Sequence, residues 1–200
     1  MPRQVDHEAR KTAIARALWR VAEARGLDKV SLREVATEAG ISLGQLQHYF
    51  ANRDEMMVFA MEFMGRKNVE RVAARMLELG DPSPRARLRA IAHEMLPLDD
   101  RAKAGSLMQL SFQLEAARSE SLRAFAERQS AALRSVLEGT IALAIRSGDV
   151  PPDRDPVEEA ALLVALGQGL RSDFHSGALT AEQTVALMDR YLDRVLIQVN

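Results

Sequence analysis

The 200-residue chain contains no cysteine, which excludes disulfide bridges, cysteine-ligated zinc, iron–sulfur clusters and thiol nucleophiles. Aromatic residues make up only 4%, and proline (7) and glycine (11) are sparse. No apolar run approaches the ~18 residues needed to cross a bilayer. The polar amino terminus, which carries acidic residues, is unlike a signal peptide. We therefore expect a cytoplasmic protein with no membrane partner.

Neither sign of charge dominates, because the chain contains 27 Lys and Arg and 28 Asp and Glu, which gives a net charge of −1. Any nucleic-acid surface must therefore be local. Residues 1–53 hold nine basic against six acidic residues, whereas residues 54–200 hold 18 against 22. The amino-terminal quarter is thus the basic part of the chain.

Helix-forming residues (Ala, Leu, Arg, Glu) are abundant, and the breakers divide the chain into nine predicted helices with no strand, an all-α fold. Gly26 closes the first helix. Ser31-Leu-Arg-Glu34 and Ser42-Leu-Gly-Gln45 are capping boxes that open the second and third. Further helices are predicted over about 52–80, 83–97, 99–117, 119–147 and 155–177. The last is capped by Thr180-Ala-Glu-Gln183 and runs to about Val199.

Residues 31–50 predict a helix-turn-helix. Only Gly40-Ile41 separates the two short capped helices, too few residues for an antiparallel hairpin, so the helices must cross steeply. Gly40 permits a left-handed turn, and Ala36 is small enough for the second helix to approach.

The second of these helices has an outward polar face. If Leu46, Tyr49 and Phe50 face inward, then Leu43, Gly44, Gln45, Gln47 and His48 face outward. Glutamine can pair with adenine, leucine can contact a thymine methyl, and a helical glycine, which costs about 1 kcal/mol relative to alanine, suits close approach to DNA. The alternative is a three-helix packing unit that touches no DNA, which leaves this outward face unexplained.

Residues 12–60, with Ala39-Gly-Ile-Ser-Leu-Gly-Gln-Leu-Gln-His-Tyr-Phe50 and Asn52-Arg-Asp-Glu55 at their centre, resemble the DNA-binding domain of TetR-family transcriptional regulators. The resemblance implies DNA contacts from Ser31, Arg33, Ser42, Leu43, Gly44, Gln45, Gln47, His48, Tyr49 and Arg53, with Arg53 on phosphate. For Arg33 a solvated surface charge is the open alternative, for His48 a cap on its own helix, and for Tyr49 a place half in the core. Gln47 and Leu43 depart from the family's common residues, so the operator cannot be carried over. The tail, with Val150-Pro-Pro-Asp153 and Leu166-Gly-Gln-Gly-Leu170, is similar to the choline-repressor branch.

The resemblance implies a DNA-binding domain over 1–53 and a helical ligand-binding and dimerisation domain over 54–200. Candidate pocket residues are Phe63, Met64, His93, Met108, Phe112 and Phe174, although each could be ordinary core. The tail has too few aromatic residues for a choline cage. Candidate dimer residues on the last two helices are Leu163, Leu166, Gly167, Leu170, Met188, Tyr191, Leu192 and Val195, unless these helices pack only on their own chain. A dimer with two DNA-binding domains is also expected on physical grounds, because one short helix contacts too few base pairs to give useful sequence specificity.

We therefore expect a homodimeric repressor that binds a palindromic double-stranded operator in the major groove and is released by an unknown small molecule, with no cofactor and no metal. An enzyme is the rival class, but the four histidines are scattered and no metal, nucleophile-elbow or phosphate-loop motif is present. A helical adaptor controlled by a protein partner is the other alternative. A closed cavity of ~300 Å³ or more in the tail would favour the ligand.

Overall fold

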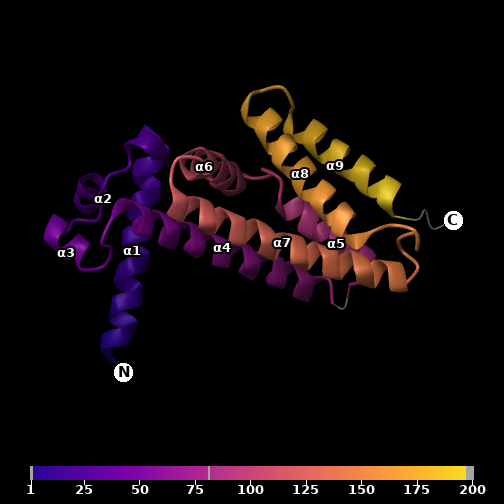
Figure 1. Cartoon of the computed structure of the whole chain (residues 1–200), viewed down its shortest axis with the longest axis horizontal. Helices are drawn as coiled ribbons and strands as arrows, with labels where there is room; N and C mark the ends of the chain where they lie inside the picture. The colour runs from indigo at the N-terminus through magenta and orange to yellow at the C-terminus, as the bar shows by residue number, and fades with distance from the viewer. Residues whose placement is uncertain (1, 81, 197–200) are drawn as a thin grey trace. The chain divides into compact units, whose positions relative to one another are not determined.

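The computed structural model describes residues 2–80 and 82–196, with side chains from His7 onward. Within these residues it contains nine α-helices and no strand, which confirms the all-α prediction (Figure 1). The helices are α1 (Pro2–Arg25), α2 (Leu32–Glu38), α3 (Leu43–Gln47), α4 (Arg53–Glu78), α5 (Pro84–Glu94), α6 (Asp100–Ala116), α7 (Glu120–Arg146), α8 (Pro156–His175) and α9 (Ala181–Val195), with a 3-10 turn η1 (Leu27–Lys29). The end predicted near Val199 lies outside the described residues. No described helix is long and apolar enough to cross a membrane.

Two of the three predicted capping boxes are complete. In α3 the Ser42 hydroxyl accepts from the backbone N–H of Gln45, and the Gln45 side chain accepts from that of Ser42; Thr180 and Gln183 do the same in α9. The box at Ser31 is only half formed. Its hydroxyl accepts from the N–H of Glu34, but the Glu34 carboxylate binds the Ser31 hydroxyl and Arg25 rather than the Ser31 backbone. Glu34 thus reaches back to Ser31 as predicted, but it binds the hydroxyl instead of the backbone N–H, while Arg25, nine residues earlier, binds the other carboxylate oxygen.

The chain divides into two compact units. The first comprises Met1–Lys67 and Leu107–Ala126, and the second comprises Asn68–Ser106 and Glu127–Asn200. Helices α4, α6 and α7 therefore contribute residues to both units. These units are defined by packing, and neither of them ends at residue 53. The predicted division between a DNA-binding domain and a ligand-binding domain at residue 53 stays a prediction.

One apolar core holds the first unit together. It combines Ile14 and Leu18 of α1, Val35 of α2, Leu46 of α3 and Met56 of α4, all at most 2% exposed. In α3 the buried face is the one predicted from helical spacing, with Leu46 inward. Since α2 and α3 share one core with α1 and α4, their outward faces are held in a defined orientation.

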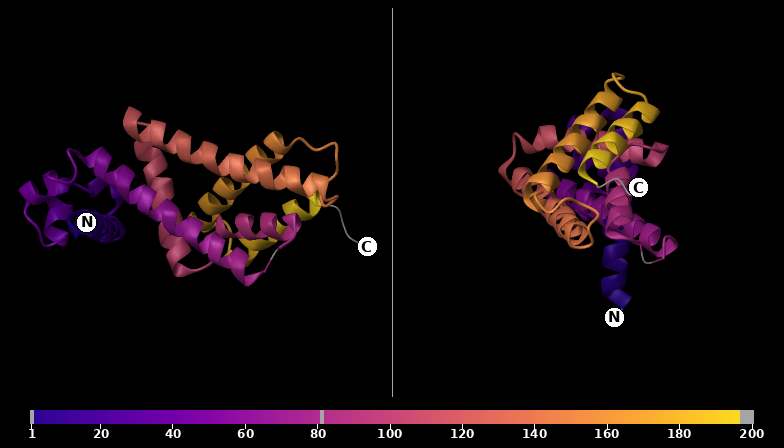
Figure 2. Two further views of the ribbon diagram at one scale, coloured as in Figure 1. Left: turned by 90° about the horizontal axis from the view of Figure 1, so that it is seen from below. Right: turned by 90° about the vertical axis from the view of Figure 1, so that its right-hand side faces the viewer.

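The core of the second unit joins α5, α7, α8 and α9. Leu88, Leu137, Leu163 and Leu192 each come from a different one of these helices and are at most 1% exposed. Helices α8 and α9 lie side by side, which both views of Figure 2 and that of Figure 1 show.

Candidate nucleic-acid interface

The turn between α2 and α3 is a Schellman motif. Gly40 has a φ of 67°, the left-handed conformation that its sequence position predicted. Its N–H donates to the carbonyl of Thr37 at 3.1 Å, and the N–H of Ile41 donates to the carbonyl of Ala36 at 3.0 Å. These bonds end α2 abruptly, and α3 starts at Leu43, three residues after Gly40.

Helix α3 presents the outward face that the sequence predicted. Gly44, Gln47 and His48 are exposed and Leu43 is half-buried, whereas Leu46 and Phe50 are at most 1% exposed. A Cβ built on Gly44 would meet nothing within 4 Å. Packing within the chain therefore does not require glycine at this position, which favours the close approach of another molecule.

The two glutamines on α3 are not equivalent. The Gln45 side-chain oxygen accepts from the backbone N–H of Ser42 at 2.9 Å, so its carboxamide is oriented by the cap. Bidentate pairing with adenine needs a donor and an acceptor aimed together, and the cap occupies the acceptor. The Gln47 carboxamide is exposed and has no hydrogen-bond partner among the described residues. Gln47 is therefore the better placed of the two for reading a base.

Tyr49 is half-buried between two histidine rings. Its ring centroid lies 4.8 Å from that of His7 on α1 and 5.5 Å from that of His48. The sequence analysis did not single out His7, because no local pattern pairs residues 42 positions apart. These contacts hold the tyrosine ring at the edge of the exposed α3 face.

Ser31, which caps α2, and Arg33 on α2 differ in whether their side chains are already hydrogen-bonded within the chain. The Ser31 hydroxyl accepts the cap bond from Glu34 and donates to its carboxylate at 3.0 Å, so it is engaged within its own unit. Arg33, two residues after Ser31, has an exposed side chain. Of the two, only Arg33 is placed to reach a phosphate without breaking an internal bond.

Arg53, the candidate phosphate contact, is also a brace inside the first unit. Its guanidinium donates to the carbonyls of Val30 at 2.7 Å and Leu27 at 2.9 Å, and to the carboxylate of Glu115 on α6 at 2.8 Å. Next to it, Asp54 accepts from Ser119 at 2.5 Å. The start of α4 is thus bonded to the segment that precedes α2 and to the α6–α7 corner. The sequence analysis missed this role because the partners lie up to 62 residues away.

Replacing Gln47 by alanine is expected to relax the base preference at one position of each half-site, at a cost of ~1–3 kcal/mol in binding to the preferred operator. Affinities for an operator and its single-base variants, measured by fluorescence anisotropy, check this. Gln45→Ala is the matched control and should change base preference less, because its carboxamide is held in the cap. An equal loss on every sequence for Gln47→Ala would contradict the assignment.

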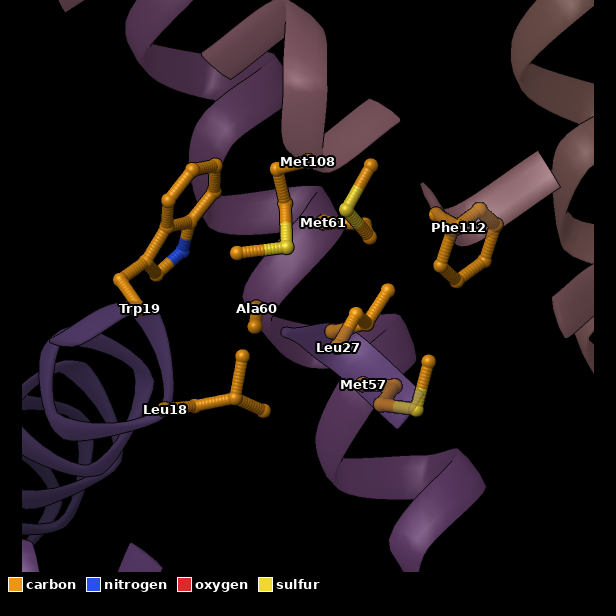
Figure 3. Close-up of a pocket in the computed structure, with 8 residues that line it drawn as sticks. All are labelled: Leu18, Trp19, Leu27, Met57, Ala60, Met61, Met108 and Phe112. Atoms are coloured by element: carbon orange, nitrogen blue, oxygen red, sulfur yellow. The ribbon is translucent and has the colours of Figure 1, made fainter. Parts of the chain in front are cut away.

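The six candidate pocket residues are divided between the two units. Four belong to the first unit (Phe63, Met64, Met108, Phe112) and two to the second (His93, Phe174). Met108 and Phe112 are buried and share a crevice (Figure 3), whereas Phe63 and Met64 are half-buried against the same core. In the second unit, His93 bonds to Asp189 at 2.8 Å and Phe174 contacts the ring of His175.

A polar cluster that the sequence analysis missed lies in the second unit. His175 Nε2 and the Ser106 hydroxyl are 2.6 Å apart, and Ser106 is buried. Burial, with the charge of nearby Arg171, lowers the pKa of His175, and burial lowers the pKa of Arg171. The imidazole is therefore kept neutral over more of the pH range than a free histidine.

Six of the eight candidate dimer residues are buried by contacts within their own chain. Leu163, Leu170, Met188, Leu192 and Val195 are at most 4% exposed. A Cβ on Gly167 would meet the Met95 side chain at 2.6 Å, so this glycine makes room for a methionine of the same chain rather than for a partner helix. These six positions are therefore packed within their own chain, and their part in a dimer interface stays a prediction.

Leu166 and Tyr191, the other two, line a surface groove of about 500 Å³ between α8 and α9. Tyr191 donates to the buried Glu159 carboxylate at 2.9 Å, and Arg154 donates to the other oxygen of that carboxylate. Burial and the bond to Glu159 raise the pKa of Tyr191 above its usual range. Leu162, which is 49% exposed, and Ala165 extend this surface along α8.

A short capped helix that crosses its neighbour at a Schellman turn and exposes Gln47, His48 and Gly44 defines a helix-turn-helix DNA-binding protein. Family models agree. Residues 14–58 match "Bacterial regulatory proteins, tetR family", and residues 84–197 match "BetI-type transcriptional repressor, C-terminal". The chain belongs to the TetR family of transcriptional repressors and has a BetI-type C-terminal domain. Members of this family are transcriptional regulators rather than enzymes.

Individual relatives give the same result. The chain is 26% identical to the regulator BetI of Rhizobium meliloti over 96% of its length and 92% of the relative's. It is 41% identical to the regulator PksA of Bacillus subtilis, but over only 50% of its length and 48% of the relative's. A transcriptional regulator of Rhodococcus sp. superposes with a TM-score of 0.77 at 31% identity, covering 95% of this chain and 99% of that one. A regulator of Saccharomonospora viridis in complex with choline has a TM-score of 0.84 at 20% identity, with 96% and 99% covered, and shares the fold.

Proposed function

We propose that the protein is a homodimeric repressor that inserts α3 of each subunit into successive major grooves of a palindromic operator and is released by a small molecule. The exposed α3 face, with Gln47 free and Gly44 open, is the observation that carries the proposal. Gln47, His48 and Leu43 would face base edges, and Arg33, Tyr49 and Arg53 the phosphates. The protein would act in the cytoplasm, where its DNA lies.

Release requires that the effector binds one conformation better than another, with a coupling of ~1–3 kcal/mol. The brace from Arg53 to Glu115 offers a path, because a shift of α6 would pull on the carbonyls of Leu27 and Val30 just before α2. The division of roles at residue 53 belongs to this proposal, with residues 1–53 binding DNA and residues 54–200 binding effector and partner.

Choline, which is bound by the Saccharomonospora viridis protein, is not the effector we propose. A quaternary ammonium group needs several aromatic faces around it. Phe112 and Phe125 pair with each other in the first unit, whereas Phe174 contacts His175 and Tyr191 binds Glu159 in the second. These four aromatic residues beyond α4 do not surround a single site within either unit.

The proposal is tested by selecting bound sequences from a random double-stranded DNA pool at ~150 mM salt, where nonspecific binding is weak. A palindrome with half-site centres ~34 Å apart is expected. Failure to enrich any sequence with protein stripped of bound small molecules would contradict it. A palindrome whose binding no small molecule weakens would instead favour control by a protein partner.

A further inference from the structure

One face of α1 is apolar along its middle and carries titratable side chains toward the amino terminus. His7, Lys11, Ile14 and Leu18 follow one another at helical spacing, so they share this face. Ile14 and Leu18 are at most 2% exposed and belong to the core of the first unit. Lys11 and His7 are half-buried and continue the same face beyond that core.

Both of these side chains contact aromatic rings at the carboxyl end of the helix-turn-helix. The His7 ring centroid lies 4.8 Å from that of Tyr49. The Lys11 ammonium lies 5.6 Å from the ring centroid of Phe50 and 5.4 Å from that of Phe59 on α4, which is a cation–π distance. The face of α1 that carries His7 therefore adjoins the exposed face of α3 at Tyr49.

Neither His7 nor Lys11 has a carboxylate partner among the described residues. On α1 the neighbouring Glu8 and Arg10 are exposed, and α3 contains no charged residue. The Arg66 guanidinium of α4 lies over one of the rings that Lys11 contacts and adds a further positive charge. Four other basic residues of the first unit do have carboxylate partners. These salt bridges join Arg20 to Glu38, Arg25 to Glu34, Lys29 to Asp28 and Arg53 to Glu115.

We propose that protonated His7 and Tyr49 together bind a DNA backbone phosphate, so that affinity for DNA depends on pH. The Tyr49 hydroxyl has no hydrogen-bond partner among the described residues and can donate to a phosphate oxygen. Because the His7 ring contacts the Tyr49 ring, its charge then lies well within one Debye length of that phosphate, about 10 Å at 0.1 M salt. The inference rests on the proposed function, in which Tyr49 faces phosphate, and it adds a residue that precedes the matched residues 14–58.

Phosphate binding favours the charged form of His7, because an imidazolium attracts an anion and a neutral imidazole does not. The complex therefore holds more protons than the free protein, and DNA affinity rises as the pH falls. Histidine is the side chain whose charge changes between about pH 5 and pH 8, so the effect falls in that range. An aromatic contact that only stabilises α1 would not add a charge to the DNA surface at low pH.

The test measures, by fluorescence anisotropy, the affinity of the full-length protein for a labelled duplex of random sequence and ~30 base pairs, because phosphate contacts are independent of sequence. Affinities are measured over a range of salt concentrations at about pH 6 and about pH 8, on either side of the histidine transition. His7→Phe is the matched variant, since it keeps a ring against Tyr49 and removes the titratable nitrogen atoms.

We expect the unaltered protein to bind about tenfold more tightly at the lower pH, and His7→Phe, in which His48 still titrates, no more than about threefold more tightly. At the lower pH the slope of log affinity against log salt should be steeper for the unaltered protein, by about 0.9 for each phosphate that His7 contacts. At the higher pH the two slopes should agree, because His7 is then neutral.

Arg16→Gln is the control. Arg16 is exposed and lies about two and a half turns from His7, on the opposite side of α1, so its loss should leave the ratio of the two affinities unchanged. Equal salt slopes for the unaltered protein and His7→Phe at the lower pH, or an equally large difference at the higher pH, would overturn the proposal. If circular dichroism shows that His7→Phe does not fold, His7→Gln replaces it with the same expectations. DNA binding without these differences contradicts only this inference, whereas failure to bind any duplex contradicts the proposed function as well.

Discussion

Replacing Arg53 by alanine is expected to lower the free energy of unfolding by about 2–3 kcal/mol and to weaken binding to all DNA sequences alike. The substitution removes three hydrogen bonds from a charged donor and leaves Glu115 without its partner. Hydrogen bonds to charged groups contribute ~1.5–3 kcal/mol each, but the Arg53 and Glu115 side chains are 29% and 19% exposed, so solvent reduces the total. Urea unfolding followed by circular dichroism measures the first effect.

Operator affinity over a range of salt concentrations measures the second effect. If Arg53 also touches phosphate, the variant should have a shallower dependence of affinity on salt. Glu115→Gln is the control, because it keeps an acceptor for Arg53 and removes only the charge. It should cost less than half of the stability lost in Arg53→Ala. An unchanged free energy of unfolding in Arg53→Ala would show that the hydrogen bonds of Arg53 do not stabilise the fold.

Replacing Leu162 by glutamate is expected to convert a dimer to monomers and to lower operator affinity about 100-fold, since two linked heads gain that much over one. Leu162, Ala165, Leu166 and Gly169 follow helical spacing along the exposed side of α8, and an exposed apolar stripe of this kind is typical of an interface. A buried carboxylate facing its symmetry mate would oppose association.

The control for this prediction is Leu77→Glu on α4. Leu77 is 82% exposed and belongs to the same unit, so the substitution adds the same charge to an apolar surface position. Sedimentation equilibrium should show a dimer for the control and a monomer for Leu162→Glu. Dimers in both variants would rule out this face of α8 as the interface.

Much of the fold could be predicted from the sequence because the signals that carry it are local. The Ser42 and Thr180 boxes, the glycine at the end of α2 and the spacing of Leu46 and Phe50 each depend on residues within one or two helical turns. The outward α3 face followed from the same spacing. The half-formed box at Ser31 marks the limit, because Arg25 competes for Glu34 from outside the helix.

The sequence by itself determined the all-α fold, the helix-turn-helix over 31–50 and the face of α3 that reaches outward, because side-chain periodicity and capping act within a single helix. The tertiary structure alone decided which apolar faces are already covered. It placed Leu163 and Met188 inside their own chain, filled the space beside Gly167 with Met95 and left Leu162 outside. It also bonded Arg53 to Glu115 and placed His7 against Tyr49. Such outcomes depend on contacts between residues far apart in the chain, and helical spacing shows that a face is apolar without showing what covers it.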